Sequence, residues 1–384
     1  MRILHFVGFH PDIGGPFSVV KGLLKSLNKL GIISSVCSIV PEEFDTKKIN
    51  NVPYINEVVQ LKSIPVISEM WPSYTSEIKK LSEKLKKYDV IHVYGIFDYC
   101  AYFTCKYLHK PYIISPHGTL IEEVLRHSFL RKKIYLYLWG KKILKGARFI
   151  HVLTNHEKEA LIKIGIEEKF LKVVPNGIDP DEFNYLPTKD SLFARYPYLK
   201  DKKIALFLSR INWKKGLDDL IPAFADVVKE INDAFLIIAG PDTDNYMQDV
   251  KNWIERYNLS DKISYVGPVY GKDKLMFLQD SDIFVLPSYS EGFPMSVIEA
   301  MYMKLPVVVT ENIGIPDEVR NSRCGIVVNK NRKEITDAII YLLKNNALSI
   351  EMGLRGRKCV GENFLWDKIA GQMLEVYEKA LCVR

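Results

Sequence analysis

The chain of 384 residues lacks several features that mark whole classes of protein. Its six cysteines form no Cys-x-x-Cys pair and no zinc-ligand spacing, which favours free thiols in a reducing cytoplasm. No apolar run approaches the roughly 18 residues that a membrane span needs, and polar residues interrupt the opening MRILHFVGFHPD too early for a secretion signal. The usual nucleic-acid-binding motifs are missing too. We therefore expect a cytoplasmic protein without a nucleic-acid partner.

The composition and the order of apolar segments predict an α/β protein with two domains. A chain with 47% hydrophobic and 26% charged residues is typical of globular proteins, and its length exceeds one ordinary core. Apolar strand-like runs alternate with amphipathic helical stretches, such as 17–30, 76–87, 217–230 and 243–257, which indicates parallel sheets covered by helices on both faces. The predicted strands are 3–9, 32–40, 90–95, 112–115 and 149–153, then 204–208, 235–239, 263–266, 283–287, 307–310 and 325–328.

A proline-containing segment over residues 179–203 has no clean periodicity and predicts the linker. We expect an N-terminal domain over 1–185 and a C-terminal domain over 186–365. In an open α/β sheet, ligands bind at the carboxyl ends of the strands, so a cleft between two such domains is the expected site.

The most informative stretch is SYSEGFPMSVIEA, residues 288–300. Glu291 follows a buried strand and lies in the loop before a helix, and Glu299 lies inside that helix, which Pro294 helps to begin. The free N–H groups at a helix start favour an anion, whereas carboxylates accept hydrogen bonds from hydroxyls. A nucleotide sugar offers both a diphosphate and hydroxyl groups.

This pattern of two glutamates around Gly-Phe-Pro resembles the retaining nucleotide-sugar transferases called glycosyl transferases group 1. Five further segments stand in that family's order, so the resemblance covers nearly the whole chain. It implies the GT-B architecture, in which two Rossmann-like domains face each other across a cleft and the last helix, here within 366–384, rejoins the first domain. The further segments are Gly14-Gly15-Pro16, Ser115-Pro116-His117-Gly118, Val174 to Asp179, Ser209-Arg210 with Lys214-Lys215-Gly216, and Val266 to Val269.

The resemblance implies roles for individual residues. Arg210 and Lys215 would hold the diphosphate, whose charge grows as the glycosidic bond breaks, so fixed cations there favour the transition state. Glu299 would accept hydrogen bonds from the ribose hydroxyls and Glu291 would contact the transferred sugar. His117 would lie beside the reacting face of that sugar. We expect the catalytic residues His117, Glu291, Arg210 and Lys215, and the donor-binding residues Gly14, Gly15, Arg210, Lys215, Gly267, Val269, Gly292, Phe293, Pro294 and Glu299.

Asp242-Thr243-Asp244 matches the Asp-x-Asp pattern with which another glycosyltransferase fold binds a divalent metal. The segment follows a strand and Pro241, so we interpret Asp242 or Thr243 as a cap for the next helix. The Arg210 and Lys215 cations make a metal unnecessary for neutralising the diphosphate. We expect no metal and no cofactor beyond the nucleoside-diphosphate sugar.

The family is retaining, and no second carboxylate is placed for a double displacement. We therefore expect same-face substitution by a hexosyltransferase that uses a UDP or GDP sugar and a glycan or lipid-linked acceptor, in surface polysaccharide or lipopolysaccharide biosynthesis. Closure of the two domains would complete the site. The alternatives are a sugar-nucleotide epimerase on the same architecture and a non-catalytic scaffold.

Residues 121–150 form a basic segment. It contains eight lysines and arginines against two glutamates, a net charge of +6, mixed with Tyr, Trp and Leu at helical spacing. This mixture suits the surface of an anionic membrane and predicts peripheral contact with its inner face. The alternative is a helix packed on its own domain with a solvated basic face. The basic residues are Arg126, Arg131, Lys132, Lys133, Lys141, Lys142, Lys145 and Arg148.

Overall fold

The computed structural model describes residues 1–7, 15–41, 55–61, 82–97, 99–122 and 129–382 of the chain. The chain divides into two compact units, Met1–Gly177 with Trp366–Arg384, and Ile178–Leu365. The boundary therefore lies at Gly177 and not at residue 185. The reason is that Phe183, Leu192 and Leu199, within the proline-containing segment, pack into the core of the second unit.

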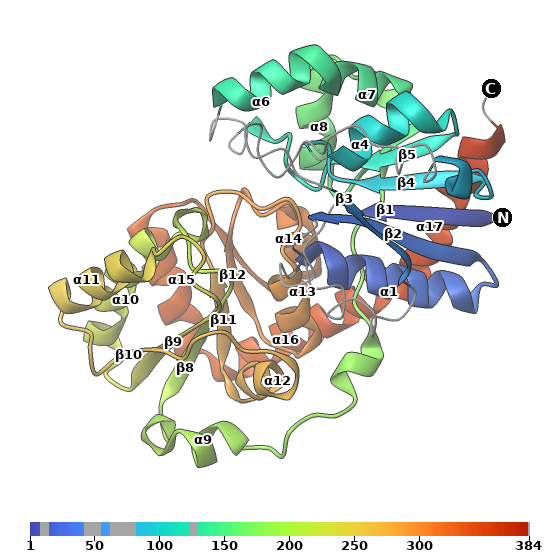
Figure 1. The fold of residues 1–384 in the computed structure, drawn as a ribbon. Helices are drawn as coiled ribbons and strands as arrows, with labels where there is room; N and C mark the ends of the chain where they lie inside the picture. The colour runs from blue at the N-terminus through green and yellow to red at the C-terminus, as the bar shows by residue number, and fades with distance from the viewer. Residues whose placement is uncertain (8–14, 42–54, 62–81, 98, 123–128, 383–384) are drawn as a thin grey trace. The chain divides into compact units, whose positions relative to one another are not determined.

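The first unit contains a seven-stranded parallel sheet in the order β3-β2-β1-β4-β5-β6-β7 (Figure 1). Parallel strands buried on both faces need nearly continuous apolar residues, and β4, VIHVY, is buried throughout. The strands are β1 (Arg2–Val7), β2 (Ile33–Pro41), β3 (Ile55–Leu61), β4 (Val90–Tyr94), β5 (Tyr112–Ser115), β6 (Phe149–Val152) and β7 (Leu171–Val173).

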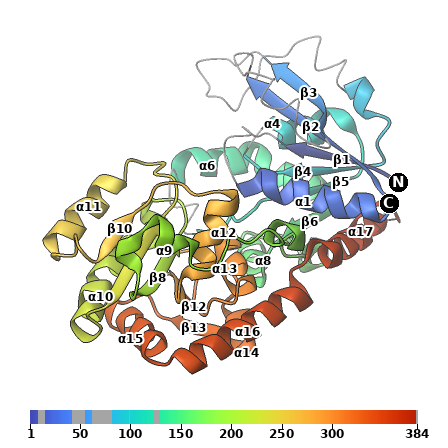
Figure 2. The same ribbon diagram turned by 90° about the horizontal axis from the view of Figure 1, so that it is seen from below.

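Alternate residues of these strands serve two cores. Ile3, Val90 and Ile113 face helices α1 (Gly15–Lys29) and α17 (Trp366–Cys382), which lie side by side (Figure 2). Their neighbours in sequence pack with the other helices of the unit, because successive side chains point to opposite faces of a sheet. Those helices are α4 (Tyr99–Phe103), η1 (Thr104–Leu108), α6 (Phe129–Tyr135), η2 (Leu136–Gly140), α7 (Lys141–Gly146) and α8 (Asn155–Lys163).

The second unit contains a six-stranded parallel sheet in the order β10-β9-β8-β11-β12-β13. Its strands are β8 (Lys203–Leu208), β9 (Ala234–Ala239), β10 (Ile263–Tyr265), β11 (Ile283–Leu286), β12 (Val307–Thr310) and β13 (Gly325–Val328). The helices that pack with it are α9 (Ser191–Arg195), α10 (Leu217–Glu230), α11 (Met247–Arg256), α12 (Gly271–Asp280), α13 (Met295–Tyr302), α14 (Pro316–Ser322), α15 (Arg332–Lys344) and α16 (Asn346–Asn363).

The predicted fold class, α/β with two Rossmann-like sheets, is confirmed. The sequence missed β3, which lies at the sheet edge, and β7, in which Lys172 interrupts the apolar run and only Leu171 is buried. Helix α11 begins at Met247 and not at residue 243. Most of the predicted helix over 76–87 lies outside the described residues.

Candidate active site

The second unit collects most of the predicted site residues at one edge of its sheet. All its paired strands are parallel, so the loops after β8, β10 and β11 leave the sheet at the same edge. Arg210 and Lys215 follow β8, Gly267 follows β10, and Glu291 follows β11. Backbone hydrogen bonds join these loops, since Gly240 N–H donates to Gly267 O at 2.9 Å and Tyr289 N–H to Lys214 O at 2.8 Å.

Lys215 and Glu291 form an ion pair with each other. The Lys215 ammonium donates to Glu291 Oε1, and the Ser288 hydroxyl donates to the same oxygen at 2.9 Å. Only 10% of the Lys215 side chain and 13% of the Glu291 side chain are exposed. A pair this well buried is costly to break by removing one partner, because the other charge is left without compensation. Lys215, predicted to bind the diphosphate, and Glu291, predicted to contact the sugar, thus neutralise each other's charge in this structure.

Glu299 has a similar partner that the sequence analysis did not single out. Lys274, on α12, donates to Glu299 Oε1 at 2.9 Å, and 23% and 15% of these side chains are exposed. Two lysine–carboxylate pairs, each formed across separate elements, therefore hold the two glutamates of the motif. The signal for Lys274 is weak in the sequence, because a lysine near the start of a helix is ordinarily a solvated residue.

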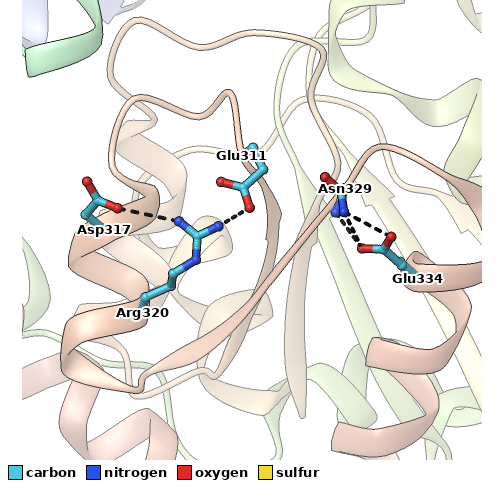
Figure 3. A network of polar contacts seen from close by, with 5 residues as sticks. All are labelled: Glu311, Asp317, Arg320, Asn329 and Glu334. Atoms are coloured by element: carbon cyan, nitrogen blue, oxygen red, sulfur yellow. Dashed lines mark hydrogen bonds and ion pairs between the residues drawn. The ribbon is translucent and has the colours of Figure 1, made fainter.

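The backbone of Glu291 is held by the loop that follows β12. Glu291 N–H donates to Asn312 O at 2.8 Å. Arg320 on α14 pairs with Glu311 at the start of this loop and, at 3.5 Å, with Asp317 in the first turn of the same helix (Figure 3). These ion pairs are substantially exposed and add little to stability. Asn329 and Glu334, also drawn in Figure 3, close the turn after β13.

Gly314, in the same loop, leaves no room for a side chain beside the motif. Its φ is +82°, and a Cβ atom there would lie 2.5 Å from Gly292 O and 3.1 Å from Glu291 O. Replacing Gly314 by alanine should lower the free energy of unfolding by about 3 kcal/mol or more, since a left-handed residue costs about 1–2 kcal/mol and the clash adds to it. Chemical denaturation measures this loss.

Gly271 supplies the matched control. Its φ is +51°, and nothing lies within 4 Å of the position that its Cβ would take. Gly271→Ala should therefore cost only the conformational term, about 1–2 kcal/mol. If the two variants lost the same free energy of unfolding, the loop around Gly314 would be able to shift away from the motif at no further cost.

Other predicted donor-binding residues lie around this edge. Phe293 is half-buried with its ring centroid 5.9 Å from that of Phe364, and Pro294 is buried directly before α13. Gly267 has a φ of +78° and open space at its Cβ position, while Val269 packs on the core. Arg210 is exposed and has no hydrogen bond or ion pair with any part of the chain that the structure describes.

The interpretation of Asp242 as a helix cap is confirmed. Its carboxylate accepts from the N–H of Tyr246 at 2.9 Å and from the N–H of Met247 at 3.3 Å, at the start of α11. Within the described ranges, no group of three or more His, Cys, Asp and Glu side chains is arranged to hold a metal ion.

In the first unit, His117 lies in a turn that follows β5. His117 and Gly118 both have positive φ values, +52° and +72°, and the His117 ring stacks on Tyr94 with centroids 5.4 Å apart. The Nε2 atom of His117 is buried and has no hydrogen-bond partner among the described residues. Burial, followed by the charge of His151, lowers the pKa of His117 to about 3, so its imidazole is neutral at pH 7.

Glu157 holds this turn, and the sequence analysis did not identify it. Its carboxylate accepts from Gly118 N–H at 2.5 Å and from Leu153 N–H at 2.9 Å. Burial raises the pKa of Glu157 to about 7, and the two N–H donors oppose that rise. Glu157 lies in the first turn of α8, where an acidic side chain ordinarily indicates only a favourable helix start, so the sequence gave no reason to connect Glu157 with His117.

A buried polar network lies beneath the His117 turn. His92 contacts the Tyr377 hydroxyl at 2.7 Å and the Ser115 hydroxyl at 2.6 Å, and Ser115 contacts His151 Nδ1 at 2.6 Å. His5 joins through the Tyr94 hydroxyl at 2.8 Å. Since Tyr377 belongs to α17, this network ties the last helix of the chain to the sheet of the first unit. No metal role is needed to explain these histidines.

The glycine loop is only partly described. Gly14 lies outside the described residues, and Gly15 is the first residue of α1. Val7 at the end of β1 is in register with Tyr94, and Tyr94 with Ser115, so the segments that carry Gly15 and His117 leave the sheet at one edge. Each unit thus presents its predicted residues at the carboxyl ends of its own strands.

Comparison with known families identifies the chain. Residues 188–359 match the family Glycosyl transferases group 1, and residues 13–182 match Glycosyltransferase Family 4. The chain belongs to the group 1 glycosyltransferases, as its motifs predicted.

Individual relatives agree with this assignment. N-acetyl-alpha-D-glucosaminyl L-malate synthase of Bacillus anthracis is 26% identical over 391 residues, covering 99% of this chain and 98% of that protein. The N,N'-diacetylbacillosaminyl-diphospho-undecaprenol alpha-1,3-N-acetylgalactosaminyltransferase of Campylobacter jejuni is 27% identical over 241 residues, 61% of each chain. The crystal structure of Anabaena HepE in complex with UDP and glucose superimposes with a TM-score of 0.80 at 18% identity, covering 98% of this chain and 99% of that one. The predicted GT-B fold is thereby confirmed.

Proposed function

We propose that this protein is a retaining, metal-independent hexosyltransferase that moves a sugar from a nucleoside-diphosphate sugar to a glycan or lipid-linked acceptor in surface polysaccharide or lipopolysaccharide biosynthesis. The observation that carries the proposal is the pair of largely buried lysine–carboxylate contacts, Lys215 with Glu291 and Lys274 with Glu299. A donor with a diphosphate and several hydroxyls can replace both contacts with partners of matching charge. UDP bound to HepE, a protein of the same fold, supports a nucleotide donor.

On this proposal, donor binding separates Lys215 from Glu291. Lys215 and the exposed Arg210 turn to the diphosphate, and Glu291 accepts a hydrogen bond from a hydroxyl of the sugar. The cations stabilise the leaving diphosphate most strongly in the transition state, when its charge is largest. Neutral His117, with an unpartnered ring nitrogen, can exchange a hydrogen bond with the sugar without adding a positive charge.

We propose that the acceptor attacks the face from which the diphosphate leaves. A diphosphate oxygen then takes the proton of the acceptor hydroxyl as the new carbon–oxygen bond forms and the old one breaks. Such a step needs no carboxylate nucleophile, and Glu291, paired with a lysine, is assigned to binding the sugar.

Thermal unfolding with UDP, GDP and their common sugar conjugates tests the donor class. One nucleoside diphosphate at about 100 times its dissociation constant should add roughly 2.7 kcal/mol to the stability of the protein. Glu299→Gln should weaken that ligand roughly 10- to 100-fold, because the variant loses a charged acceptor for the ribose hydroxyls. The amide oxygen of glutamine can still accept from Lys274, so the unliganded fold is expected to persist.

Glu351→Gln is the control, since Glu351 is an exposed carboxylate on α16 that pairs with Arg355. This variant should keep the full stabilisation by the ligand. A protein that no nucleotide stabilises, or a Glu299→Gln variant that binds as tightly as the parent, would contradict the proposed donor site.

The acceptor is proposed from chemistry and from relatives. The Campylobacter relative carries an undecaprenol-linked substrate in its name, which supports a lipid-linked acceptor here. Among the residues that the structure describes, none of the helices combines the length and the hydropathy that a membrane span requires. We propose cytoplasmic transfer at the inner face of a membrane, with residues 121–150 as the peripheral contact.

A further inference from the structure

An apolar pocket opens within the basic segment of the first unit. Helices α6, η2 and α7 follow one another without a break, and Ile164 and Ile166, just beyond the end of α8, also line the pocket. The pocket has a volume of about 590 Å³, which lies within the range of roughly 300–1,000 Å³ common for small-molecule sites. Its apolar lining comes from Ile134, Leu136, Tyr137, Leu138, Ile164 and Ile166.

Apolar side chains at this pocket face solvent to an unusual degree. Tyr137 is 79% exposed, Leu138 51% and Ile134 50%. They lie in or beside η2, a π-helical turn between two α-helical stretches, and such turns are rare and frequently mark functional sites. Single exposed apolar side chains are common on protein surfaces, whereas neighbouring ones that form a patch often mark an interaction site.

Positive charge surrounds the pocket. Lys132, Lys133 and Lys141 contribute to its lining, and residues 132–146 contain five lysines and no acidic residue, a net charge of +5. The two glutamates that follow Ile166 are already paired, Glu167 with Lys169 at 2.7 Å and Glu168 with Lys158 at 2.6 Å. The charge at this pocket therefore complements an anion.

We propose that this pocket binds the hydrocarbon chain of a lipid whose head group is anionic, with the lysines around the opening holding the head group. The apolar cavity favours the hydrocarbon chain of the lipid, because burial of each methylene is favourable. The lysines favour a negatively charged head group. The inference deepens the proposed membrane contact from a surface to a site for one lipid molecule. It involves no sugar donor, so its failure and the failure of the proposed transfer reaction are observed separately.

Calorimetric titration with alkyl phosphates below their micelle concentrations tests the site. Octyl phosphate should bind at least tenfold more tightly than butyl phosphate, since each buried methylene is worth about fourfold in affinity. The affinity for dodecyl maltoside, which has an uncharged head group, should be about fivefold lower than that for dodecyl phosphate, or lower still. Affinity that is independent of chain length, or of head-group charge, would overturn the proposal.

Variants with matched controls locate the binding. Leu138→Gln with Ile164→Gln should weaken dodecyl phosphate at least tenfold, and Tyr137→Ser provides a second variant at a still more exposed position. Ile350→Gln with Leu354→Gln is the control, because these α16 side chains are 57% and 52% exposed in the second unit. Lys141→Gln should weaken binding about fivefold, whereas Lys251→Gln on α11 should not. Equal losses in pocket and control variants would show nonspecific adsorption and would refute the site.

Discussion

Glu291→Gln should lower the rate of sugar transfer roughly 100- to 1,000-fold, the usual cost of removing one electrostatic contact that acts in the transition state. Glutamine keeps the volume of the side chain and can accept from Lys215 and Ser288, the two partners of Glu291 Oε1. The variant loses the negative charge that attracts a sugar hydroxyl. Lys215 is then left without its counter-charge in a poorly exposed position, so we also expect a stability loss of roughly 1–3 kcal/mol.

Steady-state kinetics with the donor found in the nucleotide screen measures this effect. The fall should appear mainly in kcat, because the contact is proposed to strengthen as the glycosidic bond breaks. Glu230→Gln is a suitable control, since Glu230 is an exposed carboxylate paired with Lys344 at the end of α10. If Glu291→Gln kept the activity of the parent, Glu291 would serve only to hold Lys215, and the proposed sugar contact would be wrong.

Acidification from pH 6.5 towards pH 4 should destabilise the first unit by several kcal/mol. Burial lowers the pKa of His5 to about 3 and that of His151 to about 4, and it lowers the pKa of His92 well below its ordinary value. In the unfolded chain these groups titrate near 6.5. Between the folded and unfolded pKa values the unfolded chain binds more protons, so the free energy of unfolding falls as the pH falls. A histidine shifted to about 4 contributes roughly 3 kcal/mol to this loss.

Glu157 acts in the opposite direction. Burial raises its pKa to about 7 from 4.5, so its contribution to stability is present below pH 4.5 and is lost as the pH rises through 7. The pKa shift of each of the three histidines is as large as that of Glu157 or larger. Their combined loss of stability in acid therefore exceeds the gain from Glu157. The net expectation for the first unit is acid destabilisation.

Hydrogen exchange measured by mass spectrometry at pH 7 and pH 5, corrected for intrinsic rates, can follow each unit separately. The amides of β1 and β4 should lose protection, whereas those of β8 and β9 should not. The second unit is an internal control because all eight histidines of the chain lie between residues 5 and 156. Equal loss of protection in both sheets would show that acid acts through something other than the histidine network.

Much of the fold was predictable from local patterns. The strands β8 to β13 coincide closely with apolar runs of the sequence, because a strand in the middle of a parallel sheet is buried on both faces. The role of Asp242 as a cap was also predictable, because a strand followed by Pro241 and a helix leaves N–H groups to satisfy. β7 was not predictable, because Lys172 interrupts its apolar run and only one of its residues is buried.

The sequence motifs predicted which residues form the candidate site, but they did not predict which of these residues contact one another. The sequence placed Arg210, Lys215 and Glu291 after strands and Glu299 in the helix that follows Glu291, and parallel pairing brings the ends of the strands to one edge. It could not show that Lys215 pairs with Glu291, because the two residues are 76 positions apart and nothing in their neighbourhoods encodes the other. Lys274 and Glu157 escaped notice for the same reason.

By itself, then, the sequence determined the alternation of strands and helices, the glutamate motif and the family, since each depends on residues near one another in the chain. The tertiary structure alone decided which charges meet. It neutralised the glutamates with Lys215 and Lys274, buried three histidines around Ser115 and Tyr94, and formed a pocket within the basic segment. The physical reason is that charge pairing, burial and cavities depend on distances in space, which chain packing sets and local sequence does not record.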